Sequence, residues 1–496
     1  MNINLSRTFL NNKYINRLKE KHPRIVQFVQ KRVSRSGPKG LWFTIGIILS
    51  AISFFYFLNI TQDILAHDPF VEADVRIMNL ITSFRDLSTA KIFLIFTYLG
   101  SWSIVLSLEA IVLAILLLLN KRRLALFSFL SVIATEGFYN ILKLIIHRTR
   151  PDAGYSLIPR NGFSFPSGHA TVSIVFYGFL GYLIYRMCKK RWQRFFVTIA
   201  TVAMIYLVGF SRMYLGVHWS SDILAGWAVG LSILILTITL LVERERFTPI
   251  EKKISILPGK TIAAIAVVLF LLEGLFIGYY YKKHPLEPRP PIPQEEKVSL
   301  PSFNNLLGTI TLPSFPKFSE TITGKNMEPV SLIVIASPEE LNKAFEKAGW
   351  FVADRGMDKL LKLGFAAYLN QPYPAAPVSP SFLKSEREAI AFEKPTALNT
   401  ARQRHHTRFW LTNYSVNGTP VWIATASFDS GLRYFITHEI KPDIDTERDF
   451  IKGELVNTGL VKNIQEIQLV PPLKGTNQGG DKFFTDGKTY VMVLGQ

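Results

Sequence analysis

Long apolar runs in the first part of the chain are the feature that most restricts its fold. A helix needs about twenty residues to cross the hydrocarbon core of a bilayer, where it satisfies its own backbone hydrogen bonds. Seven runs are long enough, at approximately residues 40–60, 92–119, 124–143, 170–188, 195–211, 222–242 and 261–281. The sequence therefore predicts an all-α polytopic membrane helix bundle, with six spans in a domain over residues 40–245 and a seventh transmembrane helix at 261–281.

Basic residues predict the orientation of this bundle. The chain has a formal net charge of +19, and ten lysines and arginines crowd residues 1–39. Others gather in the turns 121–123, 186–194 and 244–260. Because cytoplasmic loops retain lysine and arginine, we expect residues 1–39 to be a basic cytoplasmic segment of a multi-pass protein in the bacterial inner (plasma) membrane. These residues flank the spans instead of forming one basic stripe, so nucleic acid is not an expected partner.

The loop after the first span, residues 68–85, has apolar side chains at helical spacing. They are Phe70, Val71, Val75, Met78, Ile81 and Phe84. Two interpretations stay open, a helix lying in the lipid interface and an ordinary helix packed against the protein.

A soluble α+β domain over residues 301–496 is expected after the last span, on the outer (periplasmic) side. Residues 284–300 begin HPLEPRPPIP, and such proline-rich segments form semi-rigid extended linkers. The single cysteine, Cys188, excludes an internal disulfide.

Local signals support this domain class. Pro329–Ile335 is typical of a strand, and Pro338–Ala348 of a helix. Ser337 and Glu340 form a capping-box pattern before that helix, and Gly349 ends it. Asn417-Gly418 between two apolar runs predicts a β-hairpin.

Three polar segments lie at the predicted outer ends of spans: Lys143–Pro151, Pro166–His169 and Ser211–Asp222. Such residues are costly near lipid unless they serve a function. Together they contain what a phosphate ester requires, namely cations, donors at a helix start, a nucleophile and an acid. The cations are Lys143, Arg150 and Arg212, and the donors are Ser167 and the amide of Gly168.

The two histidines of these segments have different surroundings. Asp222 follows His218 by four residues, so its carboxylate can accept a hydrogen bond from one ring nitrogen and orient the other toward phosphorus. We therefore expect His218 to be the nucleophile. His169 lies beside the anion site without such a carboxylate, and we expect it to protonate the leaving group.

The patterns K-x6-RP, PSGH and SR-x5-H-x3-D, in this order, resemble the signature motifs of the type 2 phosphatidic acid phosphatase and vanadium haloperoxidase superfamily. The resemblance covers about residues 40–245 and implies a six-helix core. It implies that Lys143, Arg150, Ser167, Gly168 and Arg212 hold phosphate, and that His218, His169 and Asp222 are catalytic. Because the phosphatases of this family need no metal, it implies no cofactor. His147 and Arg148 fall at variable motif positions and are expected to have no role.

Several functions remain open at this stage. The lipid bilayer and a lipid phosphate are the expected partners, and undecaprenyl pyrophosphate, phosphatidylglycerophosphate, phosphatidic acid and lipid A phosphates all fit. Undecaprenyl pyrophosphate is preferred because its recycling needs an outward-facing site. A vanadate-dependent haloperoxidase and a scaffold or transporter are the alternatives, the last with the C-terminal domain as a binding module.

Three glutamates within the spans, Glu109, Glu136 and Glu273, are candidates for proton or head-group handling. Hydrogen bonds between packed helices are the preferred explanation.

Residues 305–490 resemble the LssY-type C-terminal domain, through RQRHHTRFW at Arg402–Trp410 and the later ASFDSGLR and THEIKPDIDTERD. Its ligand-type residues are His405, His406, Asp429, His438, Asp443 and Asp445. Their spacing matches no metal motif, and strand alternation places the two adjacent histidines on opposite faces. A structural hydrogen-bond network is the preferred explanation, followed by a binding module for glycan, lipid head group or protein.

Overall fold

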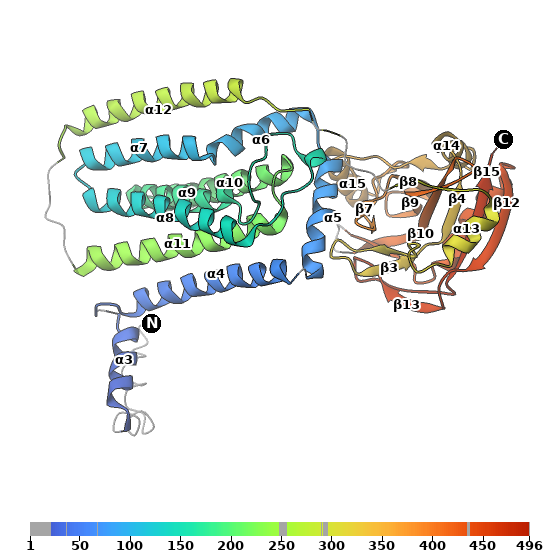
Figure 1. The fold of residues 1–496 in the computed structure, drawn as a ribbon, viewed down its shortest axis with the longest axis horizontal. Coiled ribbons are helices and arrows are strands. Elements are labelled where there is room, and N and C mark those ends of the chain that lie inside the picture. Colours follow the sequence, from blue (N-terminus) through green and yellow to red (C-terminus); the bar gives the residue numbers. More distant parts are fainter. Residues whose placement is uncertain are drawn as a thin grey trace. The chain divides into compact units, whose positions relative to one another are not determined.

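The computed structural model describes residues 21–35, 37–66, 68–247, 255–288, 290, 296–433 and 437–495. The chain forms two compact units (Figure 1). One comprises Met1–Ala66 and Asp86–Pro290, and the other His67–Arg85 and Pro291–Gln496. Residues 1–20 and 36 of the predicted basic segment 1–39 lie outside the described residues, and the described part contains the helix α3 (Pro23–Val33).

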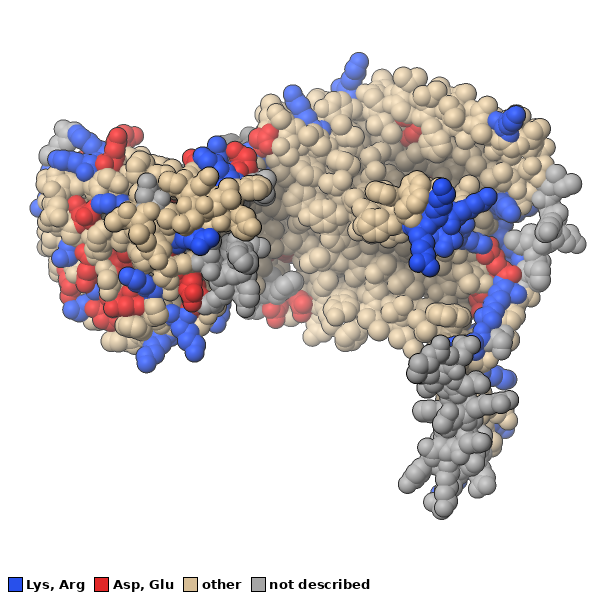
Figure 2. Space-filling model, turned by 180° about the vertical axis from the view of Figure 1, so that it is seen from behind, with Lys and Arg blue, Asp and Glu red and all other residues tan. Residues whose placement is uncertain are grey.

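The first unit is a bundle of long helices. They are α4 (Leu41–Leu65), α6 (Leu87–Leu99), α7 (Trp102–Leu118), α8 (Arg122–Ile146), α9 (Gly168–Met187), α10 (Arg191–Tyr214), α11 (Ser220–Phe247) and α12 (Gly259–Lys283). Among the described residues, six of these helices are long and apolar enough to cross a membrane, and the pair α6 and α7 forms a seventh candidate span. Figure 2 shows a broad uncharged surface on this unit, with Lys and Arg gathered toward the end that carries α3. The predicted membrane bundle is confirmed.

The second predicted span is broken. Its halves α6 and α7 meet at an angle of 53°, because Ser101 between them has an extended backbone. A Cβ atom on Gly100 would lie 2.4 Å from Val208 and 3.0 Å from His169. Only glycine permits this approach, so the bend brings α6 close to the start of α9.

Helix α9 is the most buried element of the bundle. Two glycines of α11 pack against it, and a Cβ atom on Gly226 or Gly230 would lie 2.8 Å from a backbone carbonyl of Ser167 or Thr171. The ends of α9 and α11 are therefore held together.

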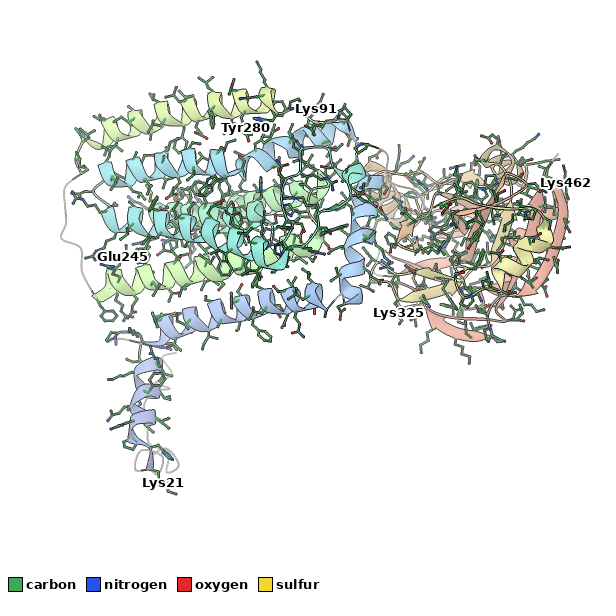
Figure 3. All side chains as sticks on the ribbon, in the orientation of Figure 1. Lys21, Lys91, Glu245, Tyr280, Lys325 and Lys462 are labelled. Carbon is green, nitrogen blue, oxygen red and sulfur yellow. The ribbon has the colours of Figure 1, made fainter. Side chains whose placement is uncertain are left out.

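The C-terminal end of the last span, α12, packs against α6. Figure 3 labels Tyr280 of α12 there and Glu245 of α11 near the opposite end of the bundle. The rings of Tyr98 and Tyr280 have centroids 5.0 Å apart, and the Tyr98 hydroxyl donates to the carbonyl of His284. The seventh span is thus joined to the rest of the bundle.

The loop helix α5 (Pro69–Ser83) belongs to the second unit, although the sequence places it within residues 40–245. Ala73 and Met78 are buried, and Arg76 donates to Glu320 at 2.6 Å. Of the two interpretations of this segment, the packed helix is confirmed.

A nine-stranded mixed sheet forms the centre of the second unit. Its main path runs β12-β15-β4-β10-β9-β8-β5, with β1 beside β9 and β11 beside β10. These strands are β1 (Val298–Leu300), β4 (Leu332–Ile335), β5 (Phe351–Val352), β8 (Ile390–Thr400), β9 (Gln403–Val416), β10 (Thr419–Arg433), β11 (Thr437–Ile440), β12 (Val461–Gln468) and β15 (Lys488–Leu494). The predicted α+β class is confirmed.

Helices and two smaller sheets complete this unit. The smaller sheets contain β2 (Phe318–Glu320), β3 (Asn326–Pro329), β6 (Phe382–Leu383) and β7 (Glu386–Arg387), and β13 (Leu473–Thr476) with β14 (Lys482–Thr485). Helices α14 (Pro338–Lys347) and α16 (Asp445–Asn457) pack on one face of the central sheet, and α13 (Phe303–Ile310) packs on the other. Helix α15 (Met357–Tyr368) follows β5.

The predicted helix and hairpin signals are confirmed, whereas the predicted strand Pro329–Ile335 is divided between β3, which ends at Pro329, and β4, which begins at Leu332. Ser337 and Glu340 exchange hydrogen bonds of 2.8 and 3.2 Å in a capping box. Gly349 has a positive φ of 78° after α14, and Asn417 and Gly418 have φ of 50° and 81° in the β9–β10 hairpin. A β-branched residue would be strained at these positions.

Candidate active site

The three polar segments meet at one end of the bundle. The first ends α8, the second begins α9, and the third joins α10 to α11. The Ser167 amide donates to the carbonyl of Asp222 at 3.0 Å, which ties the second segment to the third. Residues far apart in sequence therefore form one site, as the sequence predicts.

Gly168 permits the close packing behind the helix start. A Cβ atom there would lie 2.8 Å from the Tyr139 ring of α8. The side-chain oxygen of Ser167 is buried and has no hydrogen-bond partner within the described ranges. Free amides and an unpartnered hydroxyl at a helix N-terminus favour an anion.

His218 is oriented by Asp222. The ring Nδ1 lies 3.2 Å from Asp222 Oδ2, which also accepts from the Trp219 amide at 3.0 Å. Both residues are almost completely buried. The predicted pairing is present, and it leaves Nε2 of His218 as the nitrogen that faces the cations.

Arg150 lies against that nitrogen. Its Nη1 is 3.1 Å from His218 Nε2 and donates to the Val217 carbonyl at 2.7 Å. Burial and the adjacent Arg150 hold the pKa of His218 well below its usual range. The imidazole is therefore neutral at physiological pH, with a lone pair available on Nε2.

The other predicted cations, Lys143 and Arg212, and the predicted acid, His169, lie at the same helix ends. Arg212 is buried and donates to Thr97 Oγ1 at 2.5 Å, while its Nε has no partner in the described part of the chain. The Lys143 ammonium lies 5.4 Å from the centroid of the Tyr139 ring. His169 occupies the first turn of α9, beside Gly100.

Arg148 contacts the site, although its variable motif position predicts no role for it. Its Nη1 donates to Asp222 Oδ1 at 2.6 Å and to Ser221 Oγ at 2.7 Å. The Arg148 side chain is 10% exposed and the Asp222 side chain 0%. The first motif contains two arginines two residues apart, and only tertiary contacts show that one faces the histidine and the other its carboxylate.

The glutamates in the spans make hydrogen bonds within the bundle. Ser128 donates to Glu109 at 3.1 Å, and Ser107 donates to Glu273 at 2.8 Å. Glu136 accepts from Tyr139 and Asn140, one turn farther along α8. The preferred explanation, hydrogen bonds between packed helices, fits Glu109 and Glu273, whereas the hydrogen bonds of Glu136 lie within α8.

The sequence model of the PAP2 superfamily matches residues 124–246. Phosphatidylglycerophosphatase B of Bacillus subtilis (strain 168) is 30% identical over 189 residues, which are 91% of that protein and 37% of this chain. The chain belongs to the PAP2 superfamily.

Other relatives of this PAP2 protein are also lipid phosphatases. An undecaprenyl-diphosphatase of Sulfolobus acidocaldarius is 29% identical over 145 residues, which cover 64% of it and 28% of this chain. The crystal structure of a transmembrane PAP2 type phosphatidylglycerolphosphate phosphatase from Bacillus subtilis matches 41% of this chain and 98% of its own, at 27% identity and a TM-score of 0.38. The LssY C-terminus model matches residues 311–489. The sequence relatives, the two family models and the membrane-spanning helices together show an integral-membrane hydrolase of phosphoester or diphosphate bonds with an LssY-like domain.

The ligand-type residues of the LssY-like domain are dispersed. His405 faces α16, with Nδ1 2.9 Å from Glu447 Oε2, and His406 faces the other side of the sheet toward Asp429. Asp443 and Asp445 make hydrogen bonds near the start of α16, and the side chain of His438 lies outside the described residues. Over the described ranges, no group of three or more His, Cys, Asp or Glu side chains is arranged to hold a metal ion.

Proposed function

We propose that the PAP2 domain hydrolyses a lipid phosphate or diphosphate through a phosphohistidine formed on His218. The observation that carries this proposal is the imidazole with Asp222 on Nδ1 and Arg150 beside Nε2. A neutral, oriented imidazole in a ring of cations is an activated nucleophile for a phosphate dianion.

The first step forms the phosphohistidine. Lys143, Arg150 and Arg212, with Ser167 and the Gly168 amide, hold the phosphoryl oxygens. His218 Nε2 forms an N–P bond while the P–O bond to the leaving group breaks, and His169 gives its proton to the departing alkoxide or phosphate. Asp222 stabilises the positive ring that results.

The second step regenerates the site. Water attacks phosphorus, His169 accepts the water proton, and the N–P bond breaks to release inorganic phosphate and neutral His218. Both histidines return to their initial protonation states, so one phosphate is released per water consumed.

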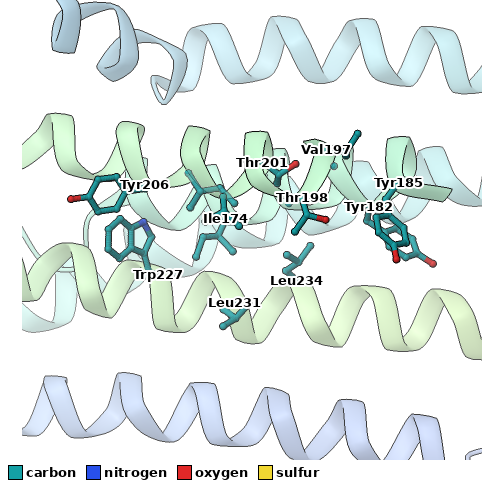
Figure 4. Close-up of a pocket in the computed structure, with 14 residues that line it drawn as sticks. Ile174, Tyr182, Tyr185, Val197, Thr198, Thr201, Tyr206, Trp227, Leu231 and Leu234 are labelled. Carbon is teal, nitrogen blue, oxygen red and sulfur yellow. The ribbon is translucent and has the colours of Figure 1, made fainter. Parts of the chain in front are cut away.

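An apolar groove between α9, α10 and α11 supports a lipid substrate. It has a volume of about 500 Å³, and its lining includes Trp227, Tyr206, Ile174 and Leu234 (Figure 4). Trp227 follows the catalytic Asp222 by five residues of α11, a rise of about 7.5 Å. We propose that a hydrocarbon chain lies in this groove with its phosphate at the catalytic end.

We propose a bacterial inner-membrane location with the site outside. The basic turns 121–123 and 186–194 lie at the end of the bundle opposite the catalytic residues, which the charge rule assigns to the cytoplasm. Relatives act on phosphatidylglycerophosphate, undecaprenyl diphosphate and lipid A. Our preferred substrate within this class is undecaprenyl pyrophosphate, whose recycling needs an outward-facing site.

Phosphate release from a panel of lipid phosphates and diphosphates tests the mechanism. In detergent, His218→Ala should abolish turnover, and Asp222→Asn should lower kcat by about 10³–10⁴-fold. Acid-labile, alkali-stable radiolabel on the wild-type protein after rapid quenching should identify the phosphohistidine. His147→Asn, which keeps the left-handed backbone of its exposed position, is the matched control.

Equal activity of the wild type and both variants would exclude His218 as nucleophile. Halide oxidation with vanadate and peroxide, without phosphate release from any lipid, would favour the haloperoxidase alternative.

A further inference from the structure

The LssY-like domain contains a polar cavity of about 240 Å³ on the face of the central sheet opposite α14 and α16. Its floor is formed by Arg404 and His406 of β9 and by Ser427 and Asp429 of β10. Ser381 contributes to the wall, and these five side chains are all buried.

Strand register explains why these side chains converge. His406 lies directly opposite Ser427, and Arg404 directly opposite Asp429, so all four project from one face. Farther along the same face, the strands carry Trp410 and Ile423, which belong to the apolar core. The sheet face thus changes from an apolar core to a polar floor within a few residues.

Several buried polar atoms at this cavity lack partners. They are Arg404 Nη1, His406 Nε2, Ser427 Oγ and Ser381 Oγ, none of which has a hydrogen-bond partner among the residues described. Their residues are only 1–4% exposed. A buried polar group without a partner costs about 1–3 kcal/mol, so four around one cavity indicate a site that receives its hydrogen bonds from a bound molecule.

The charges around the cavity balance. Two arginines, Arg404 and Arg408, and two carboxylates, Glu328 and Asp429, line it. Burial lowers the pKa of His406 to about 4, so this ring is neutral at physiological pH. Arg404 is already paired with Asp429 at 2.9 Å and with Glu393 at 3.2 Å. A strongly anionic ligand would meet these carboxylates without an excess of cations.

We propose that this cavity binds a neutral, hydroxyl-rich ligand of the saccharide class. Its free groups include a donor-only guanidinium nitrogen, two hydroxyls that donate or accept, and an imidazole nitrogen. Sugar hydroxyls, which both donate and accept, match this mixed set. The volume corresponds to about eight water molecules, the space of one sugar ring with its hydroxyls. The proposal is independent of the reaction at His218.

Ligand-observed saturation-transfer NMR on the full chain in lipid nanodiscs tests this site, since nanodiscs avoid glycosidic detergents. The probes are glucose, galactose, mannose and N-acetylglucosamine, with glucuronate, glycine and methyl phosphate as charged comparisons, each up to about 10 mM. At least one neutral sugar should give saturable binding. Ser427→Ala and Ser381→Ala should each weaken that binding at least about tenfold.

These variants separate ligand binding from folding. Each removes a hydroxyl that has no partner among the described residues, so the thermal midpoint should stay unchanged or rise, and phosphate release should be unaffected. Ser299→Ala, at an exposed position of β1, should bind as the wild type does. The proposal fails if no neutral sugar binds, or if sugar binding survives both serine substitutions. It also fails if a charged probe is the only one that binds and Ser427→Ala abolishes that binding.

Discussion

Asp222 is held on both carboxylate oxygens, by His218 and the Trp219 amide on one and by Arg148 on the other. The residue that orients the proposed nucleophile is therefore itself oriented by a cation from a different segment. A catalytic ring displaced by about 1 Å can lose two orders of magnitude in rate. This arrangement makes Arg148 a positioning residue.

Replacing Arg148 by lysine should lower kcat by about 10- to 100-fold with little change in KM. Lysine keeps the charge, but it cannot reach Asp222 and Ser221 with the fixed geometry of a guanidinium. Steady-state phosphate release gives both constants. His147→Asn is the neighbouring control, and a kcat within twofold of the wild type for Arg148→Lys would show that Asp222 needs no such support.

Gly168 provides a second residue-scale prediction. Gly168→Ala should reduce kcat at least about tenfold, because its Cβ would collide with Tyr139 and shift the first turn of α9, where His169 lies. Gly137→Ala in α8 is matched to it, since a Cβ there meets nothing within 4 Å. Phosphate release and thermal midpoints of both variants check this, and equal rates would show that the turn tolerates displacement.

At the scale of elements, β9 separates two polar environments. Odd-numbered His405 lies against Phe450 of α16, with ring centroids 4.2 Å apart, and even-numbered His406 lies in the polar cavity on the other face. The prediction that the adjacent histidines occupy opposite faces is confirmed. Strand alternation dictates it, whereas the identity of each neighbour depends on the register with β8 and β10.

Burial of His406 should make the stability of the LssY-like domain pH-dependent. Its pKa is lowered to about 4 from an ordinary value near 6.5, although Asp429 opposes the lowering and Arg404 and Arg408 add to it. Between these values the unfolded state binds more protons, so stability is lost as pH falls through this window. The resulting loss in the free energy of unfolding is at most about 3 kcal/mol.

The comparison of wild type with His406→Gln isolates this effect, because glutamine does not titrate. The difference in the free energy of unfolding between the wild type and His406→Gln should shrink from pH 7 to pH 5. Hydrogen exchange of β9 peptides in the full chain, measured for both proteins at each pH, reports it. A difference that is constant with pH would mean that His406 has the same pKa in the folded and unfolded states.

At the scale of the whole molecule, the two units are interleaved in sequence. Helix α5 lies between the first two spans in the chain yet packs with the C-terminal domain, and its Arg76 is buried against Glu320. The LssY-like domain therefore includes a segment of the membrane domain's own loop. No local pattern reveals this, because an amphipathic helix also suits a lipid surface.

The single cysteine offers a test of the topology. Cys188 lies in the basic turn between α9 and α10, which we predict to be cytoplasmic. A membrane-impermeant maleimide should leave it unlabelled in intact cells and label it after permeabilisation. In a Cys188→Ser background, Ser299→Cys should be labelled in intact cells. The reverse pattern would place the catalytic end inside.

The sequence by itself determined the spans, the three phosphatase motifs and the pairing of His218 with Asp222, because these depend on hydrophobic length and on spacing within one helical turn. Only the tertiary structure decided the contact of Arg148 with Asp222, the bend between α6 and α7, the placement of α5, and the polar cavity over Ser427. Each of these depends on which surfaces meet across long separations in sequence, and side-chain packing selects those contacts without leaving a local pattern.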